Sequence, residues 1–156
     1  KQLVYHYPCP GVSEYGSGLA EITDVIIDDY GEHGCQKGEP IKLTIKYYAV
    51  ESFTNLRVRM EFTASSGVVG TAVSDDAFSG DCGVGETVVS INTNHFVPTE
   101  YSCILLLFAM NEYGEQSVVH RVSPAFSFTI IDKREGCLKW LPQYWGYTEY
   151  PPLSLN

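Results

Sequence analysis

Apolar and polar residues alternate with a period of two along several segments of the chain. In the first, the apolar odd positions from Ile41 to Ala49 alternate with Lys42, Thr44, Lys46 and Tyr48. In the next, Val58, Met60 and Phe62 alternate with Arg57, Arg59 and Glu61, and segment 126–130 repeats the pattern. Successive side chains of a β-strand point to opposite faces, so each segment predicts a strand with one buried face.

Other segments depart from simple alternation. Residues 101–110 are apolar at nearly every position, which is typical of a central strand buried on both faces. In segment 22–27, Ile22 and Val25 are three residues apart, and a β-bulge there would bring Ile22, Val25 and Ile27 to one face. Further strands are expected at 68–73, 87–92 and 116–122.

Glycine and proline turn signals separate these runs, and no segment shows the apolar spacing of an amphipathic helix. About eight half-buried strands need a second sheet to cover them, so we predict an all-β fold, a two-sheet antiparallel β-sandwich of jelly-roll or immunoglobulin-like type. Residues 1–18 form a lead-in in which prolines and glycines break any regular element, residues 19–132 form the sandwich, and residues 133–156 form a tail rich in aromatic residues and proline.

Composition narrows the possible classes of protein. With 156 residues, 44% of them hydrophobic and 19% charged, the chain suits one folded domain and is unlike a disordered one. The net charge of −9 argues against nucleic acid, whose binding needs a basic surface, and against an anionic membrane surface. No apolar run approaches the ~20 residues that cross a bilayer, so we expect no membrane insertion.

Candidate chemistry is sparse. Five cysteines at scattered spacing are a poor disulfide framework and favour a reducing, cytoplasmic setting. The four histidines lack metal-ligand spacing and the carboxylates lack EF-hand spacing, so we expect no metal and no cofactor. No phosphate-binding loop and no nucleophile elbow occurs, so we expect no enzyme. A start at Lys1, without a signal peptide, suggests a processed chain or a piece of a longer one.

A series of short motifs carries a resemblance to a known family. In order, they are Gly16–Ile22 (GSGLAEI), Lys37–Ile45 (KGEPIKLTI), Gly67–Thr71 (GVVGT), Pro98–Tyr101 (PTEY) and Ala125–Ile130 (AFSFTI). This series, covering about residues 16–131, resembles the C-terminal domain of Wzt, the nucleotide-binding subunit of O-antigen polysaccharide ABC transporters.

The resemblance implies a fold and a function. The fold is again a jelly-roll or immunoglobulin-like sandwich. The function is that of a non-catalytic carbohydrate-binding module, which recognises a finished bacterial surface polysaccharide, often at its capped non-reducing end, before export. Family members are cytoplasmic, work with the nucleotide-binding and membrane subunits of the transporter, and form homodimers that can exchange a C-terminal strand.

The tail supplies one set of candidate glycan-binding residues. Trp140, Trp145 and Tyr147 lie close together in sequence, beside Tyr144 and Tyr150. An aromatic ring can cover the C–H face of a sugar, and several such contacts would hold a polymer. The alternative is that the tryptophans plug an open end of the sandwich or pack across a dimer interface.

Two predicted strands supply the other set. Tyr48 points outward from one strand, together with Lys42 and Lys46, and Arg57 and Arg59 point outward from the next. If these strands pair, the residues form a basic, partly aromatic patch suited to hydroxyls or to an anionic cap. The alternative is a solvated sheet face whose charges discourage edge association.

Two rival functions remain open at this point. One is a structural or adhesion β-sandwich that assembles through its edge strand or its aromatic tail. The other, which the sequence supports least, is a jelly-roll enzyme, because a glycosidase needs two carboxylates about 5 to 9 Å apart and no local pattern indicates such a pair.

Overall fold

A computed structural model describes residues 2–156; Lys1, the first residue of the predicted lead-in, lies outside the described residues. Over this range the chain forms eleven strands and one short helix. The strands are β1 Leu3–His6, β2 Ser13–Tyr15, β3 Ala20–Ile27, β4 Cys35–Gln36, β5 Ile41–Ala49, β6 Phe53–Ala64, β7 Gly67–Val73, β8 Phe78–Gly80, β9 Gly83–Ile91, β10 Glu100–Met110 and β11 Gln116–Ile131. The helix is α1, Pro142–Trp145.

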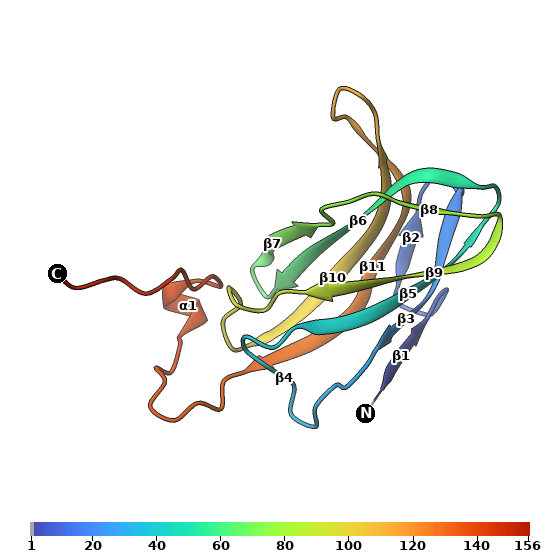
Figure 1. Cartoon of the computed structure of the whole chain (residues 1–156). Helices are drawn as coiled ribbons and strands as arrows, with labels where there is room; N and C mark the ends of the chain where they lie inside the picture. Colours follow the sequence, from blue (N-terminus) through green and yellow to red (C-terminus); the bar gives the residue numbers. More distant parts are fainter. Residues whose placement is uncertain (1) are drawn as a thin grey trace.

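The strands form two sheets packed face to face (Figure 1), which confirms the predicted antiparallel β-sandwich. Within the described residues, one sheet has four strands in the order β1-β3-β5-β9. The other has seven, in the order β2-β11-β10-β6-β7, with β4 added beside β11 and β8 beside β6. All named pairs are antiparallel except β4 with β11, which run parallel.

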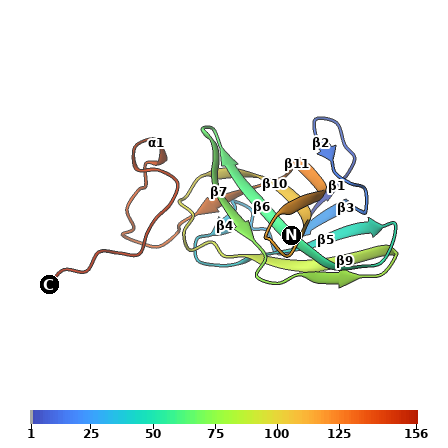
Figure 2. The ribbon, with the colours of Figure 1, turned by 90° about the horizontal axis from the view of Figure 1, so that it is seen from above.

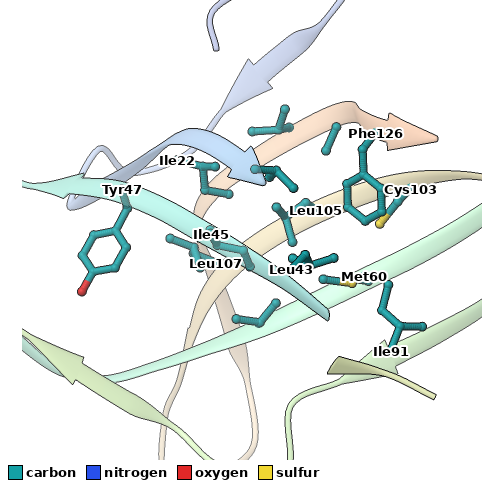
Figure 3. Packing of buried hydrophobic residues seen from close by; sticks show 14 of the residues in the cluster. Ile22, Leu43, Ile45, Tyr47, Met60, Ile91, Cys103, Leu105, Leu107 and Phe126 are labelled. Carbon is teal, nitrogen blue, oxygen red and sulfur yellow. The ribbon is translucent and has the colours of Figure 1, made fainter. Parts of the chain in front are cut away.

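Alternation explains which side chains fill the space between the sheets. The odd positions of β5 from Ile41 to Ala49 are buried, and so are Val58, Met60 and Phe62 of β6. Figure 3 shows Leu43 and Ile45 of β5 meeting Cys103 and Leu105 of β10 across the core. These are the inward faces that the sequence predicts.

The two irregular predictions are also confirmed. In β3 the register shifts between Ile22 and Asp24, and Ile22, Val25 and Ile27 are all buried on the core side. Strand β10 lies in the middle of the seven-stranded sheet, and its Leu106 and Phe108 are buried on the face opposite the core.

Several details differ from the sequence-based prediction, and the short strands β4 and β8 were not predicted. The lead-in contains two short strands, because Pro8, Pro10 and Gly11 fall between β1 and β2, whereas Gly16 and Gly18 follow β2. Strand β1 pairs with β3, and β2 pairs with β11. The segments predicted as separate strands at 116–122 and 126–130 form one strand, β11. Helix α1 lies in the tail, where Pro142 occupies its first turn, a position that tolerates a missing N–H.

The tail leaves the sandwich at one end. Seen from two directions, residues after β11 pass through α1 and run away from the body toward the C-terminus (Figures 1 and 2). Leu153 and Leu155 are almost fully exposed, at 94% and 99%.

Candidate functional site

The structure separates the predicted patch of Tyr48, Arg57 and Arg59. Tyr48 lies on the outer face of the four-stranded sheet, between Glu21 of β3 and Val84 of β9. Arg57 and Arg59 lie on β6, in the seven-stranded sheet. Strands β5 and β6 are consecutive in sequence but belong to opposite sheets, so the pairing on which the patch depended is wrong. The chain crosses from one sheet to the other between them.

Arg57 and Arg59 instead share a face with a residue that the sequence did not single out. Arg59 and Arg121 both stand opposite Leu106 of β10, from the strands on its two sides. Arg57 stands opposite Phe108 in the next row. We call this surface the arginine face, and define it by Tyr15, Arg57, Arg59, Leu106, Phe108, Gln116 and Arg121. It carries three of the chain's four arginines.

Neighbouring polar groups fix the position of Arg59. Its Nε donates to Glu61 Oε2 at 3.1 Å, and its Nη2 lies 3.1 Å from the same oxygen. Its Nη1 donates to the Gln116 side-chain oxygen. The guanidinium carbon lies 5.7 Å from the centre of the Phe108 ring, within the range of a cation–π contact. The planar group therefore lies over an apolar floor, which Leu106 and Phe108 provide.

Arg121 and Arg57 have no carboxylate partner among the described residues. The Arg121 guanidinium carbon lies 5.4 Å from the centre of the Tyr15 ring. Arg57 Nη1 donates to the carbonyl oxygens of Ser74 and Asp75, and its buried Nε has no acceptor among residues 2–156. Among residues 2–156, Glu61 is the only residue whose carboxylate pairs with these arginines, so the face is basic on a chain of net charge −9.

The tryptophans of the tail pack on each other. The rings of Trp140 and Trp145 meet edge to face at 5.2 Å, and Trp140 Nε1 donates to the Gly146 carbonyl at 2.7 Å. This closes the chain around α1. Trp145 remains 48% exposed and Tyr144 78% exposed, so part of this aromatic cluster is open to solvent.

Tyr147 lies apart from the tryptophans, against the sandwich. Its ring meets Tyr101 at 6.4 Å, edge to face. The next residue, Thr148, forms a bridge with Phe96, and Glu149 N–H donates to the His95 carbonyl at 3.1 Å. The tail is thus attached to the loop before β10, and Tyr147 is part of that attachment.

Lys37 strengthens the same attachment. Its ammonium donates to the carbonyls of Asn94, at 2.7 Å, and Phe96, and lies 3.3 Å from Glu149. The Lys37 side chain is only 9% exposed. A single cation therefore links the loop and the tail.

A polar hollow of about 310 Å³ lies beside Trp140, lined also by Asp132, Arg134 and Glu149. Asp132 accepts from Arg134 Nε at 2.9 Å and from Nη2 at 2.6 Å. These hydrogen bonds hold the pKa of the Asp132 carboxyl well below its usual range. An indole wall beside planar charged groups gives the tail a second surface on which sugar hydroxyls could bind.

No group of three His, Cys, Asp or Glu side chains among residues 2–156 is placed to hold a metal ion. Buried His120 is used structurally: its Nδ1 accepts from Ile22 N–H at 2.8 Å, and its Nε2 lies 3.0 Å from Glu14. In the same range, no helix has the length and apolar character to cross a membrane.

One known protein family matches most of the chain. The model of the Wzt C-terminal domain matches residues 12–139. The chain belongs to the Wzt C-terminal domain family. A crystal structure of the C-terminal domain of Wzt shares the fold, with a TM-score of 0.72, 14% identity, and coverage of 95% of this chain and 90% of that one.

A second solved structure shows how widely the sandwich is shared. A Niemann-Pick type C2 protein from Japanese carpenter ant is similar with a TM-score of 0.51 and 13% identity, over 76% of this chain and 96% of that one. Among curated proteins there is no match. The predicted Wzt resemblance is therefore confirmed, and the two structural matches support the fold.

The sequence missed Tyr15 because it lies on β2, in a segment predicted to have no regular element, and missed Gln116 and Arg121 for a local reason. Along β11 the register to β10 shifts near Phe108, and buried Val119 and Val122 are three residues apart. Simple alternation does not hold across such a shift, so the outward direction of Arg121 could not be read from it.

Proposed function

We propose that this chain is a non-catalytic carbohydrate-binding module of an ABC transporter that exports a bacterial surface polysaccharide. Membership of the Wzt C-terminal domain family supports the transporter setting. On this proposal the module works in the cytoplasm, beside the nucleotide-binding and membrane subunits, and holds the glycan that the transporter engages.

We further propose that the glycan lies on the arginine face, which would also receive a capped non-reducing end. The observation that carries this proposal is the clustering of Arg57, Arg59 and Arg121 around buried Leu106 and Phe108. Guanidinium groups bind hydroxyls, carboxylates and phosphates through paired N–H groups. Leu106 and Phe108 are covered and support the arginine side chains from beneath. An acidic sugar or a phosphate would fit this basic surface best.

The test is binding to an array of bacterial surface polysaccharides with natural and trimmed termini. The wild-type chain should bind selectively, and Arg59→Ala/Arg121→Ala should lose most of the signal. Lys42→Ala is the matched control, because Lys42 is an exposed cation on the opposite sheet. A folded sample that binds no polysaccharide, or equal loss in all variants, would contradict the proposal.

The tail residues Trp140, Trp145 and Tyr147 enter as a second contact. Trp145 and the hollow beside Trp140 are accessible, whereas Tyr147 is engaged with Tyr101. Trp145→Ala on the same array separates the two surfaces. Binding that falls only with Trp145→Ala would move the site from the arginine face to the tail.

Assembly through the tail is the alternative that a specific observation favours. Leu153 and Leu155 are almost fully exposed at the end of a segment that leaves the body. A homodimer in which these residues pack on a partner would explain their apolar character. Light scattering of the full chain and of a chain ending at Glu149 decides this, because a dimer that depends on the tail should be lost on truncation.

A further inference from the structure

An apolar cleft opens between the two sheets, away from the arginine face. Its volume is about 350 Å³. It lies between β7 and β9. Among the described residues, each of these strands stands at the end of the strand order of its sheet. Phe62 and Met60 of β6 form its floor, Val89 and Ile91 of β9 one wall, and Tyr147 of the tail closes part of it.

Two small residues on β7 create this space. Gly70 stands opposite Phe62, and Ala72 stands opposite Met60, so both positions face inward with those core residues. A Cβ built on Gly70 meets no atom within 4 Å, which shows that the space beside it is empty. Glycine in a strand interior weakens the strand and often marks a place where a ligand approaches the backbone.

Gly70 and Ala72 are exposed, so the cleft is open to solvent on this side. Larger apolar side chains at these two positions would cover apolar lining, and such filling commonly stabilises a fold. The two small residues instead leave the lining accessible, which is the arrangement expected of a binding cleft.

The lining indicates the chemistry of the occupant. No Asp, Glu, Lys or Arg of the described chain lines the cleft, although the protein has 29 such residues by the sum of 19 acidic and 10 basic. Three of the polar lining residues, Asn92, His95 and Thr148, lie at the end near the tail, and the others, Thr71, Ser74 and Ser90, are small hydroxyl residues of the β7 and β9 sides. An apolar pocket with a few polar groups, the larger of them at one end, suits a ligand with an apolar body and a neutral polar head.

We propose that this cleft binds the hydrocarbon chain of a neutral single-chain amphiphile, with its hydroxyl or amide head beside Asn92, His95 and Thr148. The absence of lining charge within the described chain disfavours an anionic or cationic ligand, whose charge would be buried without a partner. The site is separate from the proposed glycan surface, since Gly70 and Ala72 face inward and the arginine face points outward.

The experiment uses the full chain and a neutral apolar fluorophore, N-phenyl-1-naphthylamine, with dodecan-1-ol as competitor. Fluorescence should rise on binding at one site per chain, and dodecan-1-ol should displace the probe more effectively than dodecylammonium. Ala72→Leu should weaken probe binding at least tenfold, because its side chain enters the cleft. Val68→Leu is the matched control, because Val68 is an exposed residue of β7 outside the cleft lining, and this variant should bind as the wild type does.

A second variant and a truncation keep the outcome decisive. If Ala72→Leu does not fold, Gly70→Val tests the same space. Unchanged binding in the filled variant, or no fluorescence rise with the wild type, overturns the proposal. So does binding that appears only in a chain ending at Glu149, because the occupant would then be the C-terminal segment, and light scattering would show whether it comes from a second copy. Arg59→Ala/Arg121→Ala should leave probe binding unchanged, so this test is independent of the proposed function.

Discussion

Arg59 and Arg121 lie in one cross-strand row of the seven-stranded sheet, on either side of β10. Neighbouring strands are about 4.8 Å apart, so the two backbone positions are separated by roughly 10 Å. Leu106 fills the position between them and is 1% exposed. The row therefore carries two guanidinium side chains on the strands flanking a covered apolar residue, and both belong to the same face of the sheet.

The first prediction concerns the charge and shape of Arg121. Arg121→Gln should weaken glycan binding about tenfold, because a hydrogen bond to a charged group contributes roughly 1.5 kcal/mol. The glycan affinity of Arg121→Lys should lie between those of the wild type and Arg121→Gln, since lysine keeps the charge and loses the planar pair of donors. Titration calorimetry with the best glycan from the array measures this. Lys42→Gln, an exposed cation on the opposite sheet, is the control, and an equal effect there would contradict the role of Arg121.

The second prediction concerns the attachment of the tail. Lys37→Met removes donors to the Asn94 and Phe96 carbonyls and the ion pair with Glu149. Hydrogen bonds from a charged group contribute about 1.5–3 kcal/mol. The free energy that holds the tail to the loop should therefore fall by about this amount, and the tail should detach more often. Hydrogen exchange at Tyr147–Glu149 should accelerate, while exchange in β10 should not.

Exposed Lys139, also in the tail, provides the matched control for this change. Lys139→Met should leave exchange at Tyr147–Glu149 as it is in the wild type. Equal acceleration in both variants would mean that general loss of positive charge, rather than the contacts of Lys37, controls the tail.

The sandwich could be predicted because alternation is local. Each inward set, such as Val58, Met60 and Phe62, follows from neighbouring residues alone. Strand pairing is not local, and nothing in the alternation of β5 and β6 tells whether they share a sheet. For that reason Arg57 and Arg59 were assigned correctly as outward residues, and Tyr48 was grouped with them wrongly.

The tail illustrates the same limit in another way. Its aromatic residues could be identified by composition, but their partners lie far away in sequence. Tyr147 meets Tyr101, whereas Trp140 and Trp145 meet each other. No periodicity links these positions, because the tail follows the outline of the loop at 92–98 rather than a regular ladder.

The third prediction concerns the five thiols. Cys9, Cys82 and Cys137 are exposed, Cys35 is half-buried, and Cys103 is fully buried in the core. Burial raises the pKa of both the Cys103 and Cys35 thiols, which lowers the fraction of reactive thiolate. A disulfide exchange reagent at pH 8 should label the three exposed thiols first, Cys35 later, and Cys103 only after unfolding. Mass spectrometry of peptides identifies the order, and rapid labelling of Cys103 in folded protein would contradict the packing.

The last prediction concerns Tyr101 and alkaline pH. Its hydroxyl donates to the Val97 carbonyl at 2.7 Å and accepts from the Val97 N–H at 3.2 Å, at a position 1% exposed. Tyr101→Phe leaves both buried groups unpaired, so it should destabilise the fold by about 1–3 kcal/mol at neutral pH. Denaturant unfolding measures this loss.

Ionisation of Tyr101 determines how the stability of the fold changes with pH. Burial raises the pKa of Tyr101 from 10.0 to about 12. The folded state therefore favours the neutral phenol, and the resulting stability is complete below pH 10 and lost as pH rises through 12. Between these values the wild type should lose stability more steeply than Tyr101→Phe, which has no phenol to ionise. Parallel slopes for the two proteins would show that the Tyr101 pKa is not raised by folding.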